Sequence, residues 1–353
     1  MQVKEWKKNI RTVVPYIPGE QPKEENVIKL NTNENPYPPS KKVMDKLKEI
    51  ENLRLYPDPS AKLLVDEIAK HFHVNSNQVF VGVGSDDVLA MAFLTFFNGK
   101  NPIFFPDITY SFYDVWAELF RIPYEKQALD SEFRIKKEDY YKENGGIIFP
   151  NPNAPTGIGE SLVFIEDIVK HNQDSVVIID EAYVDFGGES AISLVEQYEN
   201  LLVVQTFSKS RSMAGMRIGY AIGSETLIQA MQNVKYSFNS YTMNQPSISL
   251  GVESLKDQTY FEETVKKIIN TREWFGEELK KLGFEFPNSK TNFLFVTHPI
   301  YSAKDMYEKA RKERIYVRYF EKPRIDNYLR ITIGTEEEMK ALLTFFKKYM
   351  EIR

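Results

Sequence analysis

The sequence contains no cysteine, which excludes disulfide bonds, thiolate nucleophiles and cysteine-ligated metal sites together. Only four histidines are present, and they are too scattered to predict a metal centre, although His71 and His73 form a short pair. No apolar run approaches the roughly 20 residues that a membrane-spanning helix needs. The first residues do not resemble a signal peptide, so we expect a metal-free cytoplasmic protein that does not enter a membrane.

The chain also lacks a strong excess of either charge. Its 45 basic and 50 acidic residues give a net charge of -5, and the basic residues are interspersed with acids. Nucleic acid is therefore not an expected partner. A length of 353 residues predicts two or three domains, and a hydrophobic content of 42% is typical of globular proteins.

Three regions differ in their patterns. Residues 1–30 are rich in proline and polar side chains, and they predict an N-terminal arm that joins the smaller domain. Within residues 31–250, short β-branched apolar runs alternate with helical stretches, which predicts a large α/β domain with a mostly parallel sheet covered by helices. Residues 251–353 carry a long charged helical pattern, three apolar runs and a terminal helix, and these predict a small α+β domain.

Polar residues follow the apolar runs, where ligands of open α/β sheets bind. Ser85 and Asp86 follow the run QVFVGVG and begin a helical stretch, whose free N–H groups and positive end suit a phosphate. Taken alone, the same pattern is also typical of a plain helix N-cap.

Two further runs end in residues that suit a carbonyl cofactor. Asp180 ends SVVIID and is able to keep a heteroaromatic nitrogen protonated, while Tyr183 donates to a neighbouring oxygen, although a simple helix start fits equally. After LLVVQTF, Lys209 offers an amine for an imine, and Ser208 and Arg217 are able to clamp a phosphate. A lysine at a buried strand end is costly unless it is used.

These motifs occur together and in one order, and the combination is more specific than any member. The sequence resembles the fold-type I, class I/II aminotransferases, most closely the histidinol-phosphate aminotransferases. The motifs that carry the resemblance cover nearly the whole chain: LNTNENPYPPS, RLYPDPS, GVGSDD, PDITYSFY, NPNAPTG, IIDEAYVDF, TFSKSRSMAGMRIGY and YLRITIGT. It implies a large domain with a mostly parallel, seven-stranded type of sheet between helices and a smaller α+β domain.

The resemblance also implies a cofactor, pyridoxal 5′-phosphate, and a role for each motif residue. Lys209 carries the Schiff base, Asp180 pairs with the pyridinium nitrogen and Tyr183 donates to the ring hydroxyl oxygen. Tyr110 stacks on the cofactor ring, and Tyr56 contacts the phosphate of the cofactor bound in the neighbouring subunit. The cofactor phosphate within the same subunit is bound by Ser85, Asp86, Ser208 and Arg217. A homodimer with shared active sites follows.

The resemblance implies that the substrates are histidinol phosphate and 2-oxoglutarate, which become imidazole acetol phosphate and glutamate in histidine biosynthesis. Arg330 then receives the α-carboxylate, because a planar guanidinium suits a carboxylate, and Asn33 lies near that group. Tyr16 approaches the substrate. Arg318 is a candidate to receive the substrate phosphate and Arg324 is a second one, and a surface role fits both equally.

Other functions also fit the same residues. An aromatic amino acid aminotransferase is the nearest alternative, and a phosphothreonine-type decarboxylase would keep every cofactor contact. A nucleotide-binding module built on GVGSDD is weaker, because its third glycine position is Asp87.

One position departs from the family pattern. The residue before Pro-Thr-Gly is usually an asparagine that donates to the ring hydroxyl oxygen, and here it is Ala154. Tyr183 then becomes the expected side-chain donor to that oxygen, unless a rotation of the loop brings Asn153 into its place. With one donor fewer, we expect a higher pKa for the Lys209 nitrogen in its link to the cofactor.

Overall fold

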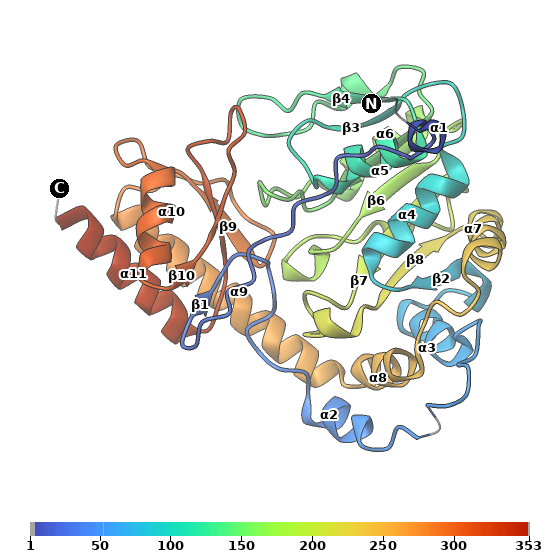
Figure 1. Ribbon diagram of the computed structural model, residues 1–353, viewed down its shortest axis with the longest axis horizontal. Helices are drawn as coiled ribbons and strands as arrows, with labels where there is room; N and C mark the ends of the chain where they lie inside the picture. The colour runs from blue at the N-terminus through green and yellow to red at the C-terminus, as the bar shows by residue number, and fades with distance from the viewer. Residues whose placement is uncertain (1–3, 52, 352–353) are drawn as a thin grey trace.

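The computed structural model describes residues 4–51 and 53–351, which form a large α/β body and a smaller α+β body joined by one long helix (Figure 1). The large body is built on a seven-stranded sheet of order β2-β8-β7-β6-β5-β3-β4. Only β8 runs antiparallel to its neighbours β2 and β7. The strands are β2 Val79–Gly82, β3 Ile103–Pro106, β4 Tyr124–Gln127, β5 Gly146–Pro150, β6 Val177–Asp180, β7 Leu201–Thr206 and β8 Gly219–Gly223. The expected mostly parallel, seven-stranded sheet is confirmed.

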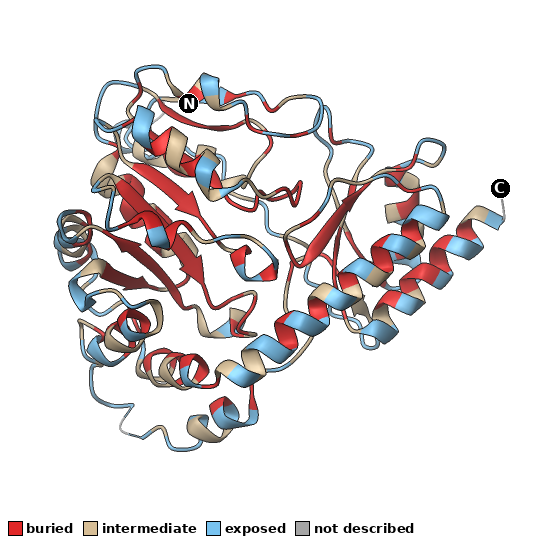
Figure 2. Ribbon diagram, turned by 180° about the vertical axis from the view of Figure 1, so that it is seen from behind, coloured by how far each residue is buried: buried red, intermediate tan, exposed pale blue. Residues whose placement is uncertain are grey.

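Both faces of this sheet are buried under helices, as the continuous apolar runs predict (Figure 2). Successive residues of a strand point to opposite faces, so Ile147 and Ile179 pack in one core while Ile148 and Ile178 pack in the other. The helices of the large body are α2 Lys41–Leu47, α3 Lys62–Phe72, α4 Ser85–Phe96, α5 Phe112–Phe120, α6 Leu162–His171, α7 Glu225–Phe238 and α8 Gln245–Lys256. Short 3-10 turns lie at Ser76–Gln78, Lys137–Tyr140, Val184–Phe186, Ala191–Leu194 and Ala214–Met216.

The smaller body has its own sheet and its own core. Its antiparallel sheet has the order β11-β12-β9, with β9 Phe293–Val296, β11 Arg318–Tyr319 and β12 Leu329–Thr332. Helix α9 (Gln258–Lys281) runs from the large body along this sheet, where α10 (Ala303–Lys312) and α11 (Glu336–Glu351) complete the layer (Figure 1). The three predicted apolar runs are thus strands, and an α+β organisation is confirmed.

The N-terminal arm crosses between the two bodies. After α1 (Glu5–Lys8) it runs without regular structure to β1 (Ile28–Lys29), which pairs in parallel with β10 (Ile315–Tyr316) of the smaller body. The arm therefore joins the smaller body, while the exact domain limits stay predictions. Across the described ranges, no helix combines the length and apolar character needed to cross a bilayer.

Candidate active site

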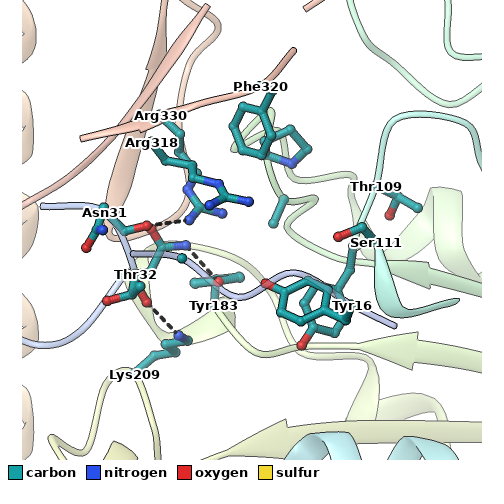
Figure 3. Close-up of a pocket in the computed structure, with 15 residues that line it drawn as sticks. Tyr16, Asn31, Thr32, Thr109, Ser111, Tyr183, Lys209, Arg318, Phe320 and Arg330 are labelled. Atoms are coloured by element: carbon teal, nitrogen blue, oxygen red, sulfur yellow. Dashed lines mark hydrogen bonds between the residues drawn. The ribbon is translucent and has the colours of Figure 1, made fainter. Parts of the chain in front are cut away.

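Two adjoining pockets lie between the bodies, at the edge of the sheet where the parallel strands end. They share Thr32, Tyr110, Ala154, Tyr183 and Lys209 among their lining residues. The first, here called the cofactor pocket, is otherwise lined by the large body. The second, called the substrate pocket, is also lined by the arm and the smaller body (Figure 3).

One end of the cofactor pocket is built for an anion. Helix α4 begins at Ser85 and points its first N–H groups into the pocket, beside the guanidinium of Arg217. Arg217 Nη2 lies 3.0 Å from Asp86 Oδ2, and Tyr110 donates to Asp86 Oδ1 at 2.7 Å. Asp86 therefore orients both the cation and the aromatic ring that face the pocket.

Two glycines allow this close arrangement. A Cβ added to Gly219 would lie 2.3 Å from Ser85 N, and one added to Gly84 would lie 2.4 Å from Arg217 Nη2. Gly84 also has a φ of 86°, which side chains rarely allow. The backbone at the start of α4 is thus left open to a phosphate, and Ser208, buried on the loop after β7, lines the same pocket.

Asp180 lies at the end of β6, as predicted, and is almost fully buried. It accepts hydrogen bonds from Tyr113 Oη at 2.8 Å and from Ala182 N at 3.2 Å. Burial raises the pKa of Asp180 to about 6, against the opposing effect of these two donors. Its carboxylate makes no ion pair with any described side chain, so a protonated ring nitrogen would supply the missing cation.

Lys209 lies between the two pockets. Its Nζ donates to the backbone oxygen of Thr32 at 3.2 Å and lies 5.8 Å from the centre of the Tyr183 ring. No ion pair is found for Lys209 in the described part of the chain, and Glu34, which lines the same pocket, is paired with Lys29. The amine is therefore available for covalent chemistry.

The loop that carries Ala154 supplies no side-chain donor to the pocket. Ala154 is buried and lines both pockets with a methyl group. Asn153 Nδ2 donates to Ile108 O and to Thr156 Oγ1, both at 3.0 Å, so its amide is used inside the loop. The rotation considered for Asn153 is not seen.

The substrate pocket is positively charged. Arg330 on β12 donates from Nη2 to Asn31 O at 2.9 Å, and its buried Nε has no partner in the described structure (Figure 3). Burial lowers the pKa of Arg330, and the nearby Arg318 acts in the same direction. No acidic side chain lines this pocket, so the two guanidiniums face it without a counter-charge.

The arm brings an aromatic side chain to the same pocket. Tyr16 lies flat on Phe112, with ring centroids 4.2 Å apart, and its ring is tilted against Tyr110 at 6.4 Å. A planar substrate group would meet aromatic faces here.

Most of the predicted residues come together in these pockets. The lining includes Ser85, Asp86, Tyr110, Asp180, Tyr183, Ser208, Lys209 and Arg217 in the cofactor pocket, and Tyr16, Asn33, Arg318 and Arg330 in the substrate pocket. Tyr56 lines neither pocket; it is 81% exposed and stacks on Tyr241. Arg324 also lies elsewhere, bound to Asp107 and to two backbone oxygens, and lines neither pocket.

Sequence reasoning missed Tyr113, which contacts Asp180, and Phe320, which lines the substrate pocket. Tyr113 lies in the quoted motif PDITYSFY, three residues after Tyr110. Tyr110 lies just before α5 and Tyr113 lies in its first turn, with ring centroids 5.7 Å apart, so this short spacing was the available signal.

The residues present fit pyridoxal 5′-phosphate. A glycine-lined helix N-terminus with an arginine suits the phosphate, a buried carboxylate without a cation suits the ring nitrogen, and a free amine suits the aldehyde.

Comparison with known proteins agrees with this geometry. Residues 25–346 match the family model of aminotransferase class I and II, and the chain belongs to this family. Its relatives include histidinol-phosphate aminotransferases from Lactococcus lactis subsp. cremoris (strain SK11), 51% identical over 98% of both chains, and from Acinetobacter baylyi, 52% identical over 98% of this chain and 97% of the relative.

A solved structure gives the same fold. The putative histidinol-phosphate aminotransferase from Erwinia carotovora atroseptica is superimposed with a TM-score of 0.86 at 24% identity, over 93% of this chain and 97% of that one. The expectations of an α/β transaminase and of pyridoxal phosphate as its cofactor are confirmed.

Proposed function

We propose that this enzyme transfers the amino group of histidinol phosphate to 2-oxoglutarate, giving imidazole acetol phosphate and glutamate. The observation that carries the proposal is the substrate pocket, where Arg318 and Arg330 face a cavity without an acidic side chain, next to the Lys209 amine. Relatives about half identical over nearly the whole chain bear the name histidinol-phosphate aminotransferase, which supports this substrate and a place in histidine biosynthesis.

Both substrates bring an anion to the same pocket. Histidinol phosphate has a phosphate and no α-carboxylate, whereas 2-oxoglutarate has two carboxylates. A guanidinium binds either group through two parallel hydrogen bonds, and the unpartnered Nε of Arg330 is one such donor. Arg330 is thus suited to bind a different anion in each half-reaction.

When bound, pyridoxal phosphate supplies an aldehyde that reacts with amines and a ring that accepts electrons from the substrate carbon. Lys209 would hold the aldehyde of the cofactor, and its amine would accept the proton of the substrate carbon and give it back at the neighbouring atom. Thr32 O holds the amine of Lys209 between the two pockets. Asp180 would be ionised beside a protonated ring nitrogen, because a cation there would lower its pKa from the raised value that burial gives.

Product analysis tests this function. With histidinol phosphate and 2-oxoglutarate we expect equal amounts of glutamate and of the keto product. With phenylalanine we expect much slower transfer, and with phosphothreonine no carbon dioxide. Faster transfer from phenylalanine would favour an aromatic aminotransferase. Carbon dioxide without a keto acid would favour a decarboxylase; a phosphothreonine decarboxylase from Porphyromonas gingivalis shares the fold, at 21% identity.

We further propose a homodimer in which Tyr56 reaches the cofactor phosphate of the neighbouring subunit. The support is its position: Tyr56 is exposed on the surface of its own chain, next to the exposed Leu53 and Leu55. Sedimentation should give twice the chain mass of 41.1 kDa. Tyr56→Phe should weaken cofactor binding several-fold, and a monomer with full activity would contradict the proposal. The cytoplasmic location stays a prediction, which cell fractionation tests.

A further inference from the structure

Asn33 is buried beside the cavity and held in an unusual backbone conformation. Its φ is 57°, in the left-handed region that asparagine enters more readily than most residues. Its N–H donates to Thr332 Oγ1 at 3.0 Å, and its carbonyl oxygen accepts from Asn292 Nδ2 at 3.0 Å. The smaller body thus fixes this residue from two sides.

The side-chain amide of Asn33 has a defined direction. Thr332 Oγ1 donates to Asn33 Oδ1 at 3.1 Å, which places the amide nitrogen toward Tyr183. Asn33 Nδ2 then donates to Tyr183 Oη at 2.8 Å. Because the Tyr183 oxygen accepts here, its own proton must point away from Asn33.

The cavity is the remaining direction for that proton. Tyr183 lines both pockets, and no acceptor for its hydroxyl is found within residues 4–51 and 53–351. Ala154, which lines the same two pockets, offers no competing donor. The ionisable groups around Tyr183 are Lys209 after β7, Arg330 on β12, Tyr113 on α5 and Asp180 at the end of β6.

We propose that Asn33 is a positioning residue, which acts through Tyr183 by turning the phenol proton toward the ring oxygen of the cofactor. This inference rests on the proposed function and deepens it. It assigns to Asn33 a task at the cofactor, in addition to its place on the wall of the substrate pocket. The chain from Thr332 through Asn33 to Tyr183 also starts on β12, two residues from Arg330.

The variant Asn33→Asp reverses the decisive hydrogen bond. A carboxylate only accepts, so Tyr183 would donate to residue 33 and its proton would be withdrawn from the cavity. A donor to the ring oxygen lowers the proton affinity of the neighbouring Lys209 nitrogen, so its loss raises that affinity. We expect the pH midpoint of the absorbance of the bound cofactor to rise by about one unit.

Two comparisons separate this effect from others. Asn26→Asp is the matched control, because Asn26 is exposed and also has a φ of 57°; it should leave the midpoint unchanged. In a Tyr183→Phe background, Asn33→Asp should cause no further rise. A rise of the same size there would show a direct charge effect of the new carboxylate and overturn the proposal, as would an unchanged midpoint in Asn33→Asp alone.

Asn33→Gly covers the case in which the carboxylate prevents folding. Glycine accepts the positive φ and removes the amide without adding charge. We expect the pH midpoint of the cofactor absorbance to rise less than in Asn33→Asp. Adding Ala154→Asn to Asn33→Gly supplies a second donor and should return the midpoint partly toward the wild-type value. No rise in Asn33→Gly would overturn the proposal. Failure of the wild-type protein to bind pyridoxal phosphate would instead contradict the proposed function.

Discussion

The cofactor pocket and the substrate pocket use their charged side chains in different ways. In the cofactor pocket, Asp86 forms an ion pair with Arg217 and accepts a hydrogen bond from Tyr110. Asp180 accepts a hydrogen bond from Tyr113. In the substrate pocket, Arg318 and Arg330 face the cavity with no acidic side chain in the lining. The first arrangement holds one ligand in a fixed orientation. The second leaves positive charge for anions that must enter and leave in every cycle.

The difference follows from where the residues come from. The cofactor pocket is built at the ends of β6 and β7 and at the start of α4, and the two cores of the large body support these elements. The substrate pocket adds the N-terminal arm and β12 of the smaller body. Lys209 lies on the boundary, where its side-chain amine donates to the backbone oxygen of Thr32.

Loss of the Lys209 amine, on the boundary between the two pockets, should lower the transfer rate more than any other change. Lys209→Ala should lower kcat by about a thousandfold or more, because no other described side chain in the pockets offers a free amine. Cofactor should still bind through the phosphate contacts, which equilibrium dialysis checks. A variant that keeps a substantial transfer rate would contradict the assignment of Lys209.

Arg330→Lys should have the next largest effect, because an ammonium does not reproduce a two-pronged contact with an anion. We expect KM to rise about tenfold or more for both histidinol phosphate and 2-oxoglutarate. Arg324→Lys is the control, since Arg324 is bound to Asp107 outside the pocket. A rise for only one of the two substrates would show that Arg330 does not serve both half-reactions.

On the cofactor side, Tyr113→Phe removes a donor to Asp180 and should raise the pKa of that carboxyl further above its ordinary range. Below its pKa the carboxyl is neutral and no longer pairs with a protonated ring nitrogen. We therefore expect kcat to fall about tenfold at acidic pH and to recover as pH rises. Tyr140→Phe is the matched control, because the buried Tyr140 hydroxyl has no described partner. A loss independent of pH would indicate a packing defect.

Ala154→Asn should have the smallest effect. A second donor to the ring oxygen should lower the pH midpoint of the cofactor absorbance by less than about one unit. The kcat of this variant at neutral pH should stay near the wild-type value. An unchanged midpoint, or one that moves upward, would contradict the interpretation of this position.

The fold and most of the pocket lining followed from local patterns. Apolar runs of strand length predicted the sheet, and their ends predicted Asp180 and Lys209, because parallel strands bring their carboxyl ends to one edge. Contacts between segments that are distant in the sequence could not be predicted from these local patterns. Asn33 and Tyr183 are 150 residues apart, and their hydrogen bond depends on how β12 meets the large body.

Single residues also show where sequence patterns are ambiguous. Arg318 and Arg324 are six positions apart and were both candidates for the substrate phosphate. Arg318 on β11 lines the substrate pocket, whereas Arg324, which follows the strand, binds Asp107 instead. The role of Tyr56 depends on a second chain, so it stays a prediction.

The most direct test of the substrate pocket is the absorbance spectrum of the cofactor-loaded enzyme as amino donors are added one at a time. Histidinol phosphate should remove the band of the lysine-linked cofactor at low concentration, and phenylalanine and phosphothreonine should leave it nearly unchanged. Loss of the band with phenylalanine and none with histidinol phosphate would contradict the account.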